Sequence, residues 1–420
     1  MTNPLQRVRP LRTRLLLLLS VVGPGIITAN VDNDAGGITT YSVAGAHFGY
    51  SLLWMLALVA LALIVVQEMS ARLGIVTGKG LADLIRESFG VRATAVVIGI
   101  VVVANLANTV SEFAGVAASM EIFGVSKYVS VPLVALSVWL LIVKGNYKFV
   151  ERIFLIASAI YLAYVLSGIM ANPPWGKVLE AARTPTFHLE VGYVTIFVTV
   201  IGTTIAPWMQ FYQQASIVDK GLKVNELGYE RIDVIVGSTF AVLVAAFITI
   251  ACAATLFANG VRIETAKDAA LALGPLAGQH AATLFALGLL NASVFSAAIL
   301  PLSTAYVVCE AFGWEMGVSR DLKDAPVFFS VYTMLIVLGA GIILFPLKSL
   351  VETMLASQTL NGVVLPIILI TMLKLINDKR LMGKYVNGRV FNVIAWAMVV
   401  ALIALTMILV ATSVFPGMFQ

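Results

Sequence analysis

The sequence predicts an all-α integral membrane protein with eleven membrane-spanning segments, two of them interrupted. Three observations lead to this prediction. The chain of 420 residues is 60% hydrophobic and only 12% charged, with a mean hydropathy of +0.96, whereas a soluble domain carries about 25% charged residues. Apolar segments of membrane length recur along the whole chain. Polar or helix-breaking residues interrupt the first and the sixth of them.

The expected spans follow one another without a linker that suggests a soluble domain, so residues 1–420 are interpreted as a single membrane transport domain. A short amphipathic surface helix is expected at 80–89, ahead of the third span. The expected spans are, approximately, 15–50 (broken), 51–72, 94–123, 128–144, 150–171, 191–218 (broken), 232–258, 281–310, 326–347, 350–376 and 390–415.

The distribution of basic residues predicts the orientation. With the N-terminus in the cytoplasm, 21 of the 27 lysines and arginines fall in segments on the cytoplasmic side and 6 in segments on the other side. Cytoplasmic loops of membrane proteins carry the excess of these residues. We therefore expect a multi-pass protein of the plasma membrane with a cytoplasmic N-terminus and an external C-terminus.

The first interruption is the polar, glycine-rich run at 30–37, which contains Asp32 and Asp34. A carboxylate in the middle of a span costs roughly 2.5–3.5 kcal/mol on insertion scales. Irregular backbone at that depth is tolerated only where it is buried in protein or lines a cavity. Secondary transporters build cation sites from such broken helices, because the break offers carboxylates and free backbone carbonyls.

The second interruption lies at 201–208, where Pro207 removes a backbone donor and two threonines, Thr203 and Thr204, stand beside it. A plain proline kink is the alternative for this span taken alone. Interrupted helices at corresponding positions of two halves indicate an inverted-repeat transporter, with its site at the repeat interface.

Both breaks supply oxygen donors for a divalent metal ion. Asp34 is the first candidate ligand, Gln358, Thr203 and the backbone carbonyls near Val31 and Thr203 come next, and Asp32 is the alternative carboxylate. An all-oxygen set suits Mg²⁺, Ca²⁺ or Mn²⁺ better than softer metals.

Other carboxylates divide into one deep in a span and several near span ends. Glu112 is mid-span and is either a further ligand or a structural partner of a neighbouring helix. Asn361 is expected to be an interhelical hydrogen-bond partner. Four glutamates near span ends are expected at the interface: Glu68, Glu121, Glu310 and Glu352.

Several other classes of function are not expected. The three histidines do not cluster, which argues against haem, zinc and copper sites, and no cofactor or enzymatic activity is expected. Basic loops that face anionic lipid account for the net charge of +5 without nucleic acid. The expected partners are the transported ion and the lipid bilayer, with no obligate protein partner.

Several motifs resemble those of the Nramp divalent-metal transporters. Laid without a gap from Gly23-Pro24-Gly25, the family pattern puts its aspartate on Asp34, its Ala-Gly-Ala on 44–46 and its Phe-Gly-Tyr on 48–50. The stretch 69–79 is similar to the end of the family's second helix, and Ser357-Gln358 with Leu365-Pro366 is similar to its tenth. The resemblance implies a LeuT-type fold of two inverted five-helix repeats, about 15–171 and about 191–376, plus an extra helix at about 390–415.

The chain departs from the family pattern at residues that the resemblance implies are important for ion selectivity. Gly37 stands where the family has asparagine, and Ala206 stands where it has the methionine of Met-Pro-His. Loss of the soft sulfur removes a filter against Mg²⁺, and the smaller residues leave room for the waters that Mg²⁺ prefers to keep. These departures resemble the Nramp-related magnesium transporter branch.

The departures also affect proton handling. The family's Asp and two His positions appear here as Thr109, Trp208 and Gln213, none of which titrates near neutral pH. We therefore expect a secondary transporter for Mg²⁺ uptake that also accepts Mn²⁺ and is not proton-coupled. The alternative is a proton-coupled Mn²⁺/Fe²⁺ transporter of ordinary Nramp type. An organic-solute symporter on the same fold, or a membrane sensor or scaffold, ranks below both.

Overall fold

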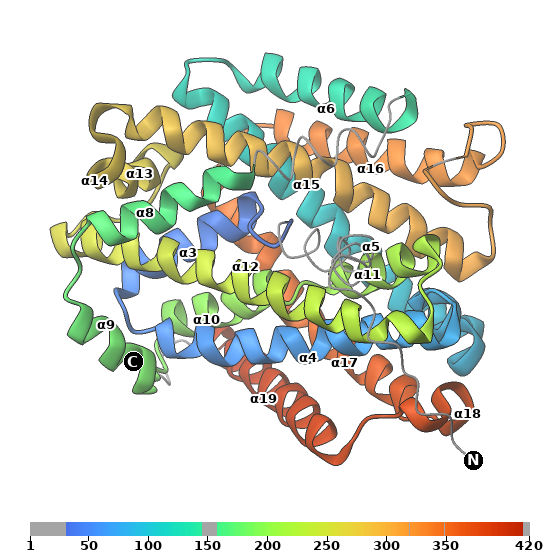
Figure 1. The fold of residues 1–420 in the computed structure, drawn as a ribbon. Helices are drawn as coiled ribbons and strands as arrows, with labels where there is room; N and C mark the ends of the chain where they lie inside the picture. Colours follow the sequence, from blue (N-terminus) through green and yellow to red (C-terminus); the bar gives the residue numbers. More distant parts are fainter. Residues whose placement is uncertain (1–30, 145–157, 319, 348, 415–420) are drawn as a thin grey trace, which may run out of the picture.

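The computed structural model describes residues 31–144, 158–318, 320–347 and 349–414, and these residues form helices and their connections without a β-strand (Figure 1). The α-helices are α3 (Ala35–Phe48), α4 (Leu53–Thr77), α5 (Leu81–Ile122), α6 (Lys127–Lys144), α8 (Leu162–Met170), α9 (Trp175–Arg183), α10 (Val191–Thr204), α11 (Pro207–Lys220), α12 (Leu227–Thr255), α13 (Ala266–Ala270), α14 (Gly274–Ala277), α15 (Ala281–Phe312), α16 (Pro326–Leu344), α17 (Leu350–Ile376), α18 (Lys379–Met382) and α19 (Arg389–Val414). Short 3₁₀ turns link them at Ser158–Tyr161, Val224–Glu226, Phe257–Asn259, Leu271–Leu273, Gly278–His280 and Gly383–Tyr385.

Nine helical stretches within the described residues are long and apolar enough to cross a membrane. The chain is therefore an all-helical, multi-span membrane protein, as its composition predicted. Two expected spans lie partly outside the described residues, because the first is described only from residue 31 and the fifth only from residue 158. The count of eleven stays a prediction, as does the first half of the first broken span.

The helices run roughly parallel or antiparallel, so their connections gather at two opposite ends (Figure 1). The helices α9, α13 and α14 lie at one end, which we call the α13 end. The helix α18 and the connections at 221–226 and 313–325 lie at the other, which we call the α18 end. Consecutive spans alternate in direction between these ends, as a multi-pass membrane protein requires.

Glycines let the helices that carry the candidate ligands approach closely. A Cβ on Gly202 of α10 would lie 2.1 Å from the carbonyl oxygen of Gln358 in α17, and one on Gly362 would lie 2.5 Å from the carbonyl oxygen of Val198. Small residues serve this purpose in membrane helices, whose association depends on close packing. The contact fixes Gln358 beside the second break.

The helix α5 contains the expected surface helix and the third span together. Gly90 separates them, since its φ of 79° and ψ of 170° are not helical. A residue with a side chain rarely adopts such a φ, whereas glycine does so readily. The chain therefore turns at Gly90 between the amphipathic segment and the span.

The structure corrects the expectation for two of the four glutamates near span ends. Glu68 and Glu310 are only 4% and 3% exposed. Glu310 accepts a hydrogen bond from the backbone N–H of Ala82, so its carboxylate caps the first turn of α5. The positive end of the helix dipole stabilises the negative charge there. A Cβ on Gly80 would lie 2.1 Å from that carboxylate. Tertiary packing, which sequence position does not reveal, buries both side chains.

Candidate metal site at the two helix breaks

The first part of the site is the start of α3. Asp34 is the N-cap residue, and its Oδ1 accepts a 2.6 Å hydrogen bond from the backbone N–H of Gly37. The N–H of Ala35 donates to Oε2 of Glu112 at 3.3 Å, and the Asp34 and Glu112 side chains are in hydrogen-bonding contact. Two carboxyl groups therefore meet at the positive end of a helix, where negative charge is favoured.

The second part is the break between α10 and α11. Only Ile205 and Ala206 separate the two helices. Because Pro207 has no N–H, the carbonyl of Thr203 has no helical donor four residues on. The Ala206 carbonyl, in contrast, accepts a 3.2 Å bond from Met209 N–H, and in the favoured amide orientation Gln210 also donates to it at 2.8 Å. The carbonyl of Thr203 is thus one oxygen that the break leaves without a helical donor.

The two breaks face each other across Gly37. A Cβ on Gly37 would lie 3.4 Å from Asp34 Oδ1, 3.3 Å from Thr203 Oγ1 and 2.5 Å from the carbonyl oxygen of Asp32. The Thr203 hydroxyl is buried and has no hydrogen-bond partner among the described residues. Tyr41 of α3 also holds the breaks together, since its hydroxyl lies 2.8 Å from that of Thr204. Carboxylate, hydroxyl and carbonyl oxygens therefore surround one small space.

Gln358 completes one wall of this space from α17. A Cβ on Gly36 would lie 1.9 Å from Gln358 Nε2, so the amide packs directly on the first turn of α3. Its Oε1 accepts a 2.8 Å bond from Asn361 Nδ2, and Asn361 and Asn108 exchange bonds of 2.9 and 3.1 Å. Asn361 is thus an interhelical partner, as expected, and it orients the Gln358 amide.

Asp32 is 2% exposed, and neither of its carboxylate oxygens has a hydrogen-bond partner among the residues from 31 onward that the structure describes. Val31 is fully buried immediately before it. Such unpartnered buried oxygens are rare in proteins. No group of three or more His, Cys, Asp or Glu residues suited to a metal ion occurs in the described part of the chain. A cation bound here would therefore need hydroxyl, amide or carbonyl oxygens beside the carboxylates.

A cavity of about 1140 Å³ leads from the α13 end towards the breaks. Its lining includes Ala117 of α5, Ile196 of α10 and Leu355 of α17. At 1.5 Å of rise per residue, these positions lie roughly 5–10 Å along their helices from Glu112, Thr203 and Gln358. Charged residues in the lining are mostly acidic: Glu121, Glu190, Glu264 and Glu352 against Lys127 and Arg262. We call this cavity the vestibule. Two of the glutamates expected near span ends, Glu121 and Glu352, line it.

Sequence reasoning missed two residues that shape the site. Asn108 orients Gln358 through Asn361, and Tyr41 links the two breaks. The spacing of four residues between Asn108 and Glu112 places both on one face of α5, and this signal could have identified Asn108. Nothing in the sequence pairs Tyr41 with Thr204, because they are 163 residues apart.

A buried cluster of oxygens at two helix breaks, with a cavity that approaches it from one end, defines a membrane protein of the broken-helix class. The profile of the family described as Natural resistance-associated macrophage protein-like, Nramp, matches residues 25–412. The chain therefore belongs to the Nramp family, which also confirms that it is not an enzyme.

Several curated relatives and solved structures match this chain over nearly its whole length. The divalent metal cation transporter MntH of Ralstonia nicotianae is 29% identical over 409 residues, which cover 91% of this chain and 88% of that protein. MntH of Bacillus subtilis is 26% identical over 406 residues, covering 94% and 93%. The manganese transporter of Eremococcus coleocola, solved with an aromatic bis-isothiourea substituted compound, has a TM-score of 0.78 at 22% identity and covers 95% and 87%.

A nucleobase-cation-symport-1 family transporter, Mhp1, has a TM-score of 0.60 at 16% identity and covers 93% of this chain and 89% of its own. These likenesses confirm the expected fold in its broad form, an all-helical architecture shared with solved membrane transporters. The boundaries of the two repeats stay a prediction.

Proposed function

We propose that this protein carries a divalent metal cation across the membrane and binds it between Asp34 and Thr203. The observation that supports this most directly is the set of buried oxygens at the two breaks, of which Thr203 Oγ1 and both carboxylate oxygens of Asp32 lack a partner within the described part of the chain. A dication would supply that missing partner and offset the burial of the carboxylates. The relatives are named as divalent metal cation and manganese transporters, which supports the same activity.

The solved transporter of Eremococcus coleocola is named for manganese, so manganese is the ion that the comparisons favour. The ordinary Nramp alternative is therefore better supported by the comparisons than magnesium uptake, and nothing in them points to a magnesium-transporting branch.

We keep Mg²⁺ as a proposed second substrate because of the donor set. Asp34, Thr203 and Gln358 offer oxygen, and Ala206 in the break offers no sulfur. Oxygen-only sites accept hard ions, whereas a thioether favours softer metals. Uptake of a dication needs no further energy source, because two charges crossing 100 mV release about 4.6 kcal/mol.

The test uses the purified protein in liposomes that contain a dye for Mg²⁺ or for Mn²⁺. We expect both ions to enter with the unaltered protein and neither to enter with Asp34→Ala. Entry of Mn²⁺ without Mg²⁺ would support the proposal of manganese transport and reject Mg²⁺ as a second substrate. Entry of neither ion with the unaltered protein, in liposomes that hold it folded, would overturn the proposal.

We also propose that uptake is not coupled to protons. The proposal rests on Thr109, Trp208 and Gln213, which occupy the positions where the family carries Asp and His. Internal pH measured during uptake at a clamped potential tests it, and no metal-dependent acidification is expected. An acidification that disappears in Glu112→Gln would contradict the proposal and assign proton transfer to Glu112, which contacts Asp34.

The orientation is proposed from the basic residues alone. The α18 end then faces the cytoplasm and the α13 end faces outward, in the plasma membrane. With this orientation, the vestibule of about 1140 Å³ opens to the outside. Its acidic excess would raise the local concentration of cations.

A further inference from the structure

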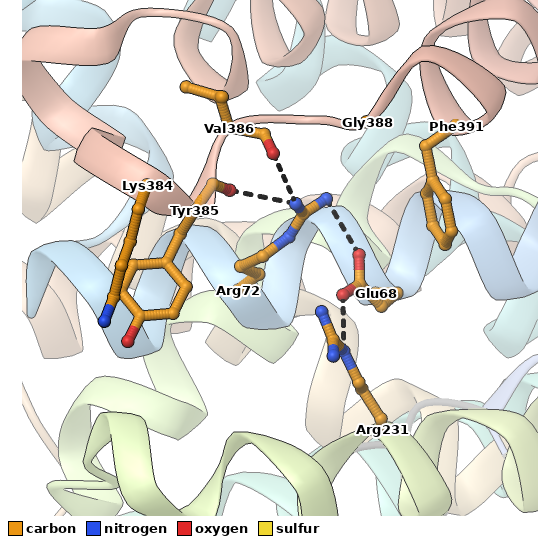
Figure 2. Close-up of a pocket in the computed structure, with 8 residues that line it drawn as sticks. All are labelled: Glu68, Arg72, Arg231, Lys384, Tyr385, Val386, Gly388 and Phe391. Carbon is orange, nitrogen blue, oxygen red and sulfur yellow. Dashed lines mark hydrogen bonds and ion pairs between the residues drawn. The ribbon is translucent and has the colours of Figure 1, made fainter.

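A second cavity, of about 260 Å³, lies at the α18 end among residues with no part in the candidate metal site. Glu68 and Arg72 reach it from α4, Arg231 from α12 and Phe391 from α19, and the other four lining residues come from the connection between α18 and α19 (Figure 2). Its lining is Glu68, Arg72, Arg231, Lys384, Tyr385, Val386, Gly388 and Phe391. Three of these side chains are cationic and one is anionic, so the cavity carries two excess positive charges.

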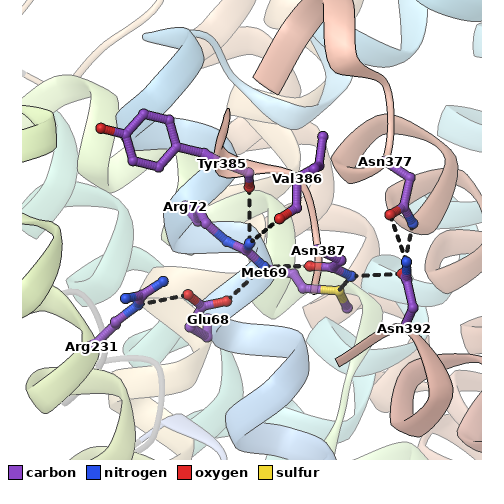
Figure 3. A network of polar contacts seen from close by, with 9 residues as sticks. All are labelled: Glu68, Met69, Arg72, Arg231, Asn377, Tyr385, Val386, Asn387 and Asn392. Carbon is purple, nitrogen blue, oxygen red and sulfur yellow. Dashed lines mark hydrogen bonds and ion pairs between the residues drawn. The ribbon is translucent and has the colours of Figure 1, made fainter. Parts of the chain in front are cut away.

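Arg72 forms the fixed wall of this cavity. Its Nη1 donates to the carbonyl oxygens of Tyr385 at 2.9 Å and Val386 at 3.3 Å, and its Nη2 donates to Asn387 and pairs with Glu68 at 3.0 Å (Figure 3). These contacts tie the chain before α19 to α4. Arg72 is 5% exposed, and its Nε is buried without a partner in the described ranges of the chain.

Arg231 and Lys384 hold the donors that a ligand could use. Arg231 Nε donates to Glu68 Oε1 at 2.8 Å. This bond fixes the side chain without using its Nη groups. Lys384 Nζ lies 5.3 Å from the centre of the Tyr385 ring. Among the described residues, neither the Nη groups of Arg231 nor Lys384 Nζ makes a hydrogen bond or an ion pair. Both side chains are substantially exposed, so their donors are accessible.

The helices that begin at this cavity continue into apolar, exposed surface. Beside Phe391, Val390 and Val393 of α19 are 70% and 68% exposed. Beside Arg231, Ile232 and Ile235 of α12 are about half exposed. In a membrane-spanning protein such surface faces lipid tails. The cationic cavity therefore lies where lipid-facing helices start, the depth at which headgroups lie.

We propose that this cavity binds the phosphate of an anionic phospholipid. Arg231 and Lys384 would donate to the phosphate oxygens, for which a guanidinium has the matching geometry, and an acyl chain would lie along the exposed face of α19. Basic pockets between membrane helices on the cytoplasmic side are known to take such headgroups. Free phosphate has the same charge chemistry but gains nothing from the apolar surface.

The experiment measures binding of a fluorescent phosphatidylglycerol to the full chain purified in a neutral detergent, with phosphatidylcholine in parallel. We expect phosphatidylglycerol to bind more tightly, and Arg231→Ala with Lys384→Ala to weaken it about 30-fold, the factor for two charges at a membrane surface. Lys384→Ala alone removes an exposed side chain, so it keeps the test valid if the double variant folds poorly, and we expect about a fivefold loss.

The matched control is Lys177→Ala with Arg183→Ala, which removes the same charge from exposed positions of α9 at the α13 end. We expect it to leave binding unchanged, and an equal loss would overturn the proposal. Equal binding of the two lipids would also overturn it. Inorganic phosphate that binds as tightly as the lipid would reject the lipid source. All these outcomes are independent of metal transport.

Discussion

At the scale of single residues, Asp34 combines a structural and a proposed functional role. Its carboxylate caps α3 through the 2.6 Å bond to Gly37, which fixes its direction before any ion arrives. Gly37 has no side chain in the space between Asp34 and Thr203, where a Cβ would lie 2.5 Å from the Asp32 carbonyl oxygen. The proposed site is therefore preorganised by the cap and kept open by glycine.

Replacing Asp34 tests that role directly. Asp34→Ala should abolish uptake of Mg²⁺ and Mn²⁺, while loss of the cap costs only about 1 kcal/mol of stability. Asp34→Asn is the matched control, because asparagine caps equally well but carries no charge, and it should also abolish uptake with a normal melting temperature. Uptake retained in either variant would assign the role to Asp32.

Adding sulfur to the second break tests ion choice. Ala206→Met should shift the preference from Mg²⁺ towards Mn²⁺ and Cd²⁺ by roughly tenfold, because a thioether favours softer ions. Competition between the ions for uptake measures the shift. Combining this change with Gly37→Asn should lower stability, since the added Cβ meets backbone. An unchanged order of preference in the single variant would show that position 206 does not contact the ion.

At the scale of helices, proline and buried charge determine the local architecture. Pro207 begins α11 and leaves the Thr203 carbonyl without a helical donor. At the α18 end, Glu68 neutralises Arg72 and orients Arg231. Breaking such a buried pair by removing one partner is far more costly than breaking an exposed one.

The proline prediction concerns the broken helix. Pro207→Ala restores an N–H that can donate to the Thr203 carbonyl, so the oxygen proposed for the ion becomes occupied. We expect apparent ion affinity in uptake assays to fall about tenfold, the equivalent of one net hydrogen bond. Pro132→Ala in α6, outside the site, is the control and should leave affinity unchanged. Equal affinity in Pro207→Ala would mean that this carbonyl is not a ligand.

The charge prediction compares two ion pairs. Glu68→Gln leaves the 5% exposed Arg72 without its anion and should reduce the free energy of unfolding by about 3–5 kcal/mol. Glu87→Gln breaks the Lys79–Glu87 pair, whose side chains are 45% and 48% exposed, and should cost less than about 1 kcal/mol. Denaturation of the two variants in the same detergent measures the difference. Similar losses would argue that the Glu68 cluster is not structural.

At the scale of the whole molecule, the two ends differ in what they offer. The α13 end opens into the acidic vestibule, and the α18 end carries the cationic cavity. Cations are thus attracted at one end and anionic lipid at the other, which agrees with the orientation that the basic residues predict.

Cysteine labelling tests that orientation. The native Cys252 and Cys309 are both buried, so they should give little background. An impermeant maleimide applied to intact cells should label Glu264→Cys, at the vestibule, and should leave Lys323→Cys, in the connection at the opposite end, unlabelled until the cells are opened. The reverse pattern would invert the proposed topology.

Much of the fold could be predicted from the sequence, because membrane spans are determined by local composition. Eight expected spans begin and end within a few residues of the observed helices, and Gly90 and Pro207 interrupt the chain where glycine and proline permit or require it. The candidate residues Asp34, Thr203 and Gln358 were also identifiable, since polar groups are conspicuous in apolar spans. The contact of Glu112 with Asp34 was not, because mid-span position alone left a ligand and a structural partner equally open.

By itself, the sequence determined that this protein is a multi-span helical membrane protein with interrupted helices that carry oxygen donors. Hydrophobicity and helix-breaking residues act over a few neighbouring positions, so the local sequence contains that information. Only the tertiary structure decided which side chains meet: Gln358 against Gly36, Tyr41 against Thr204 and Arg231 against Glu68. These contacts join segments more than 150 residues apart, and they depend on how glycine-lined helices pack, which no local pattern encodes.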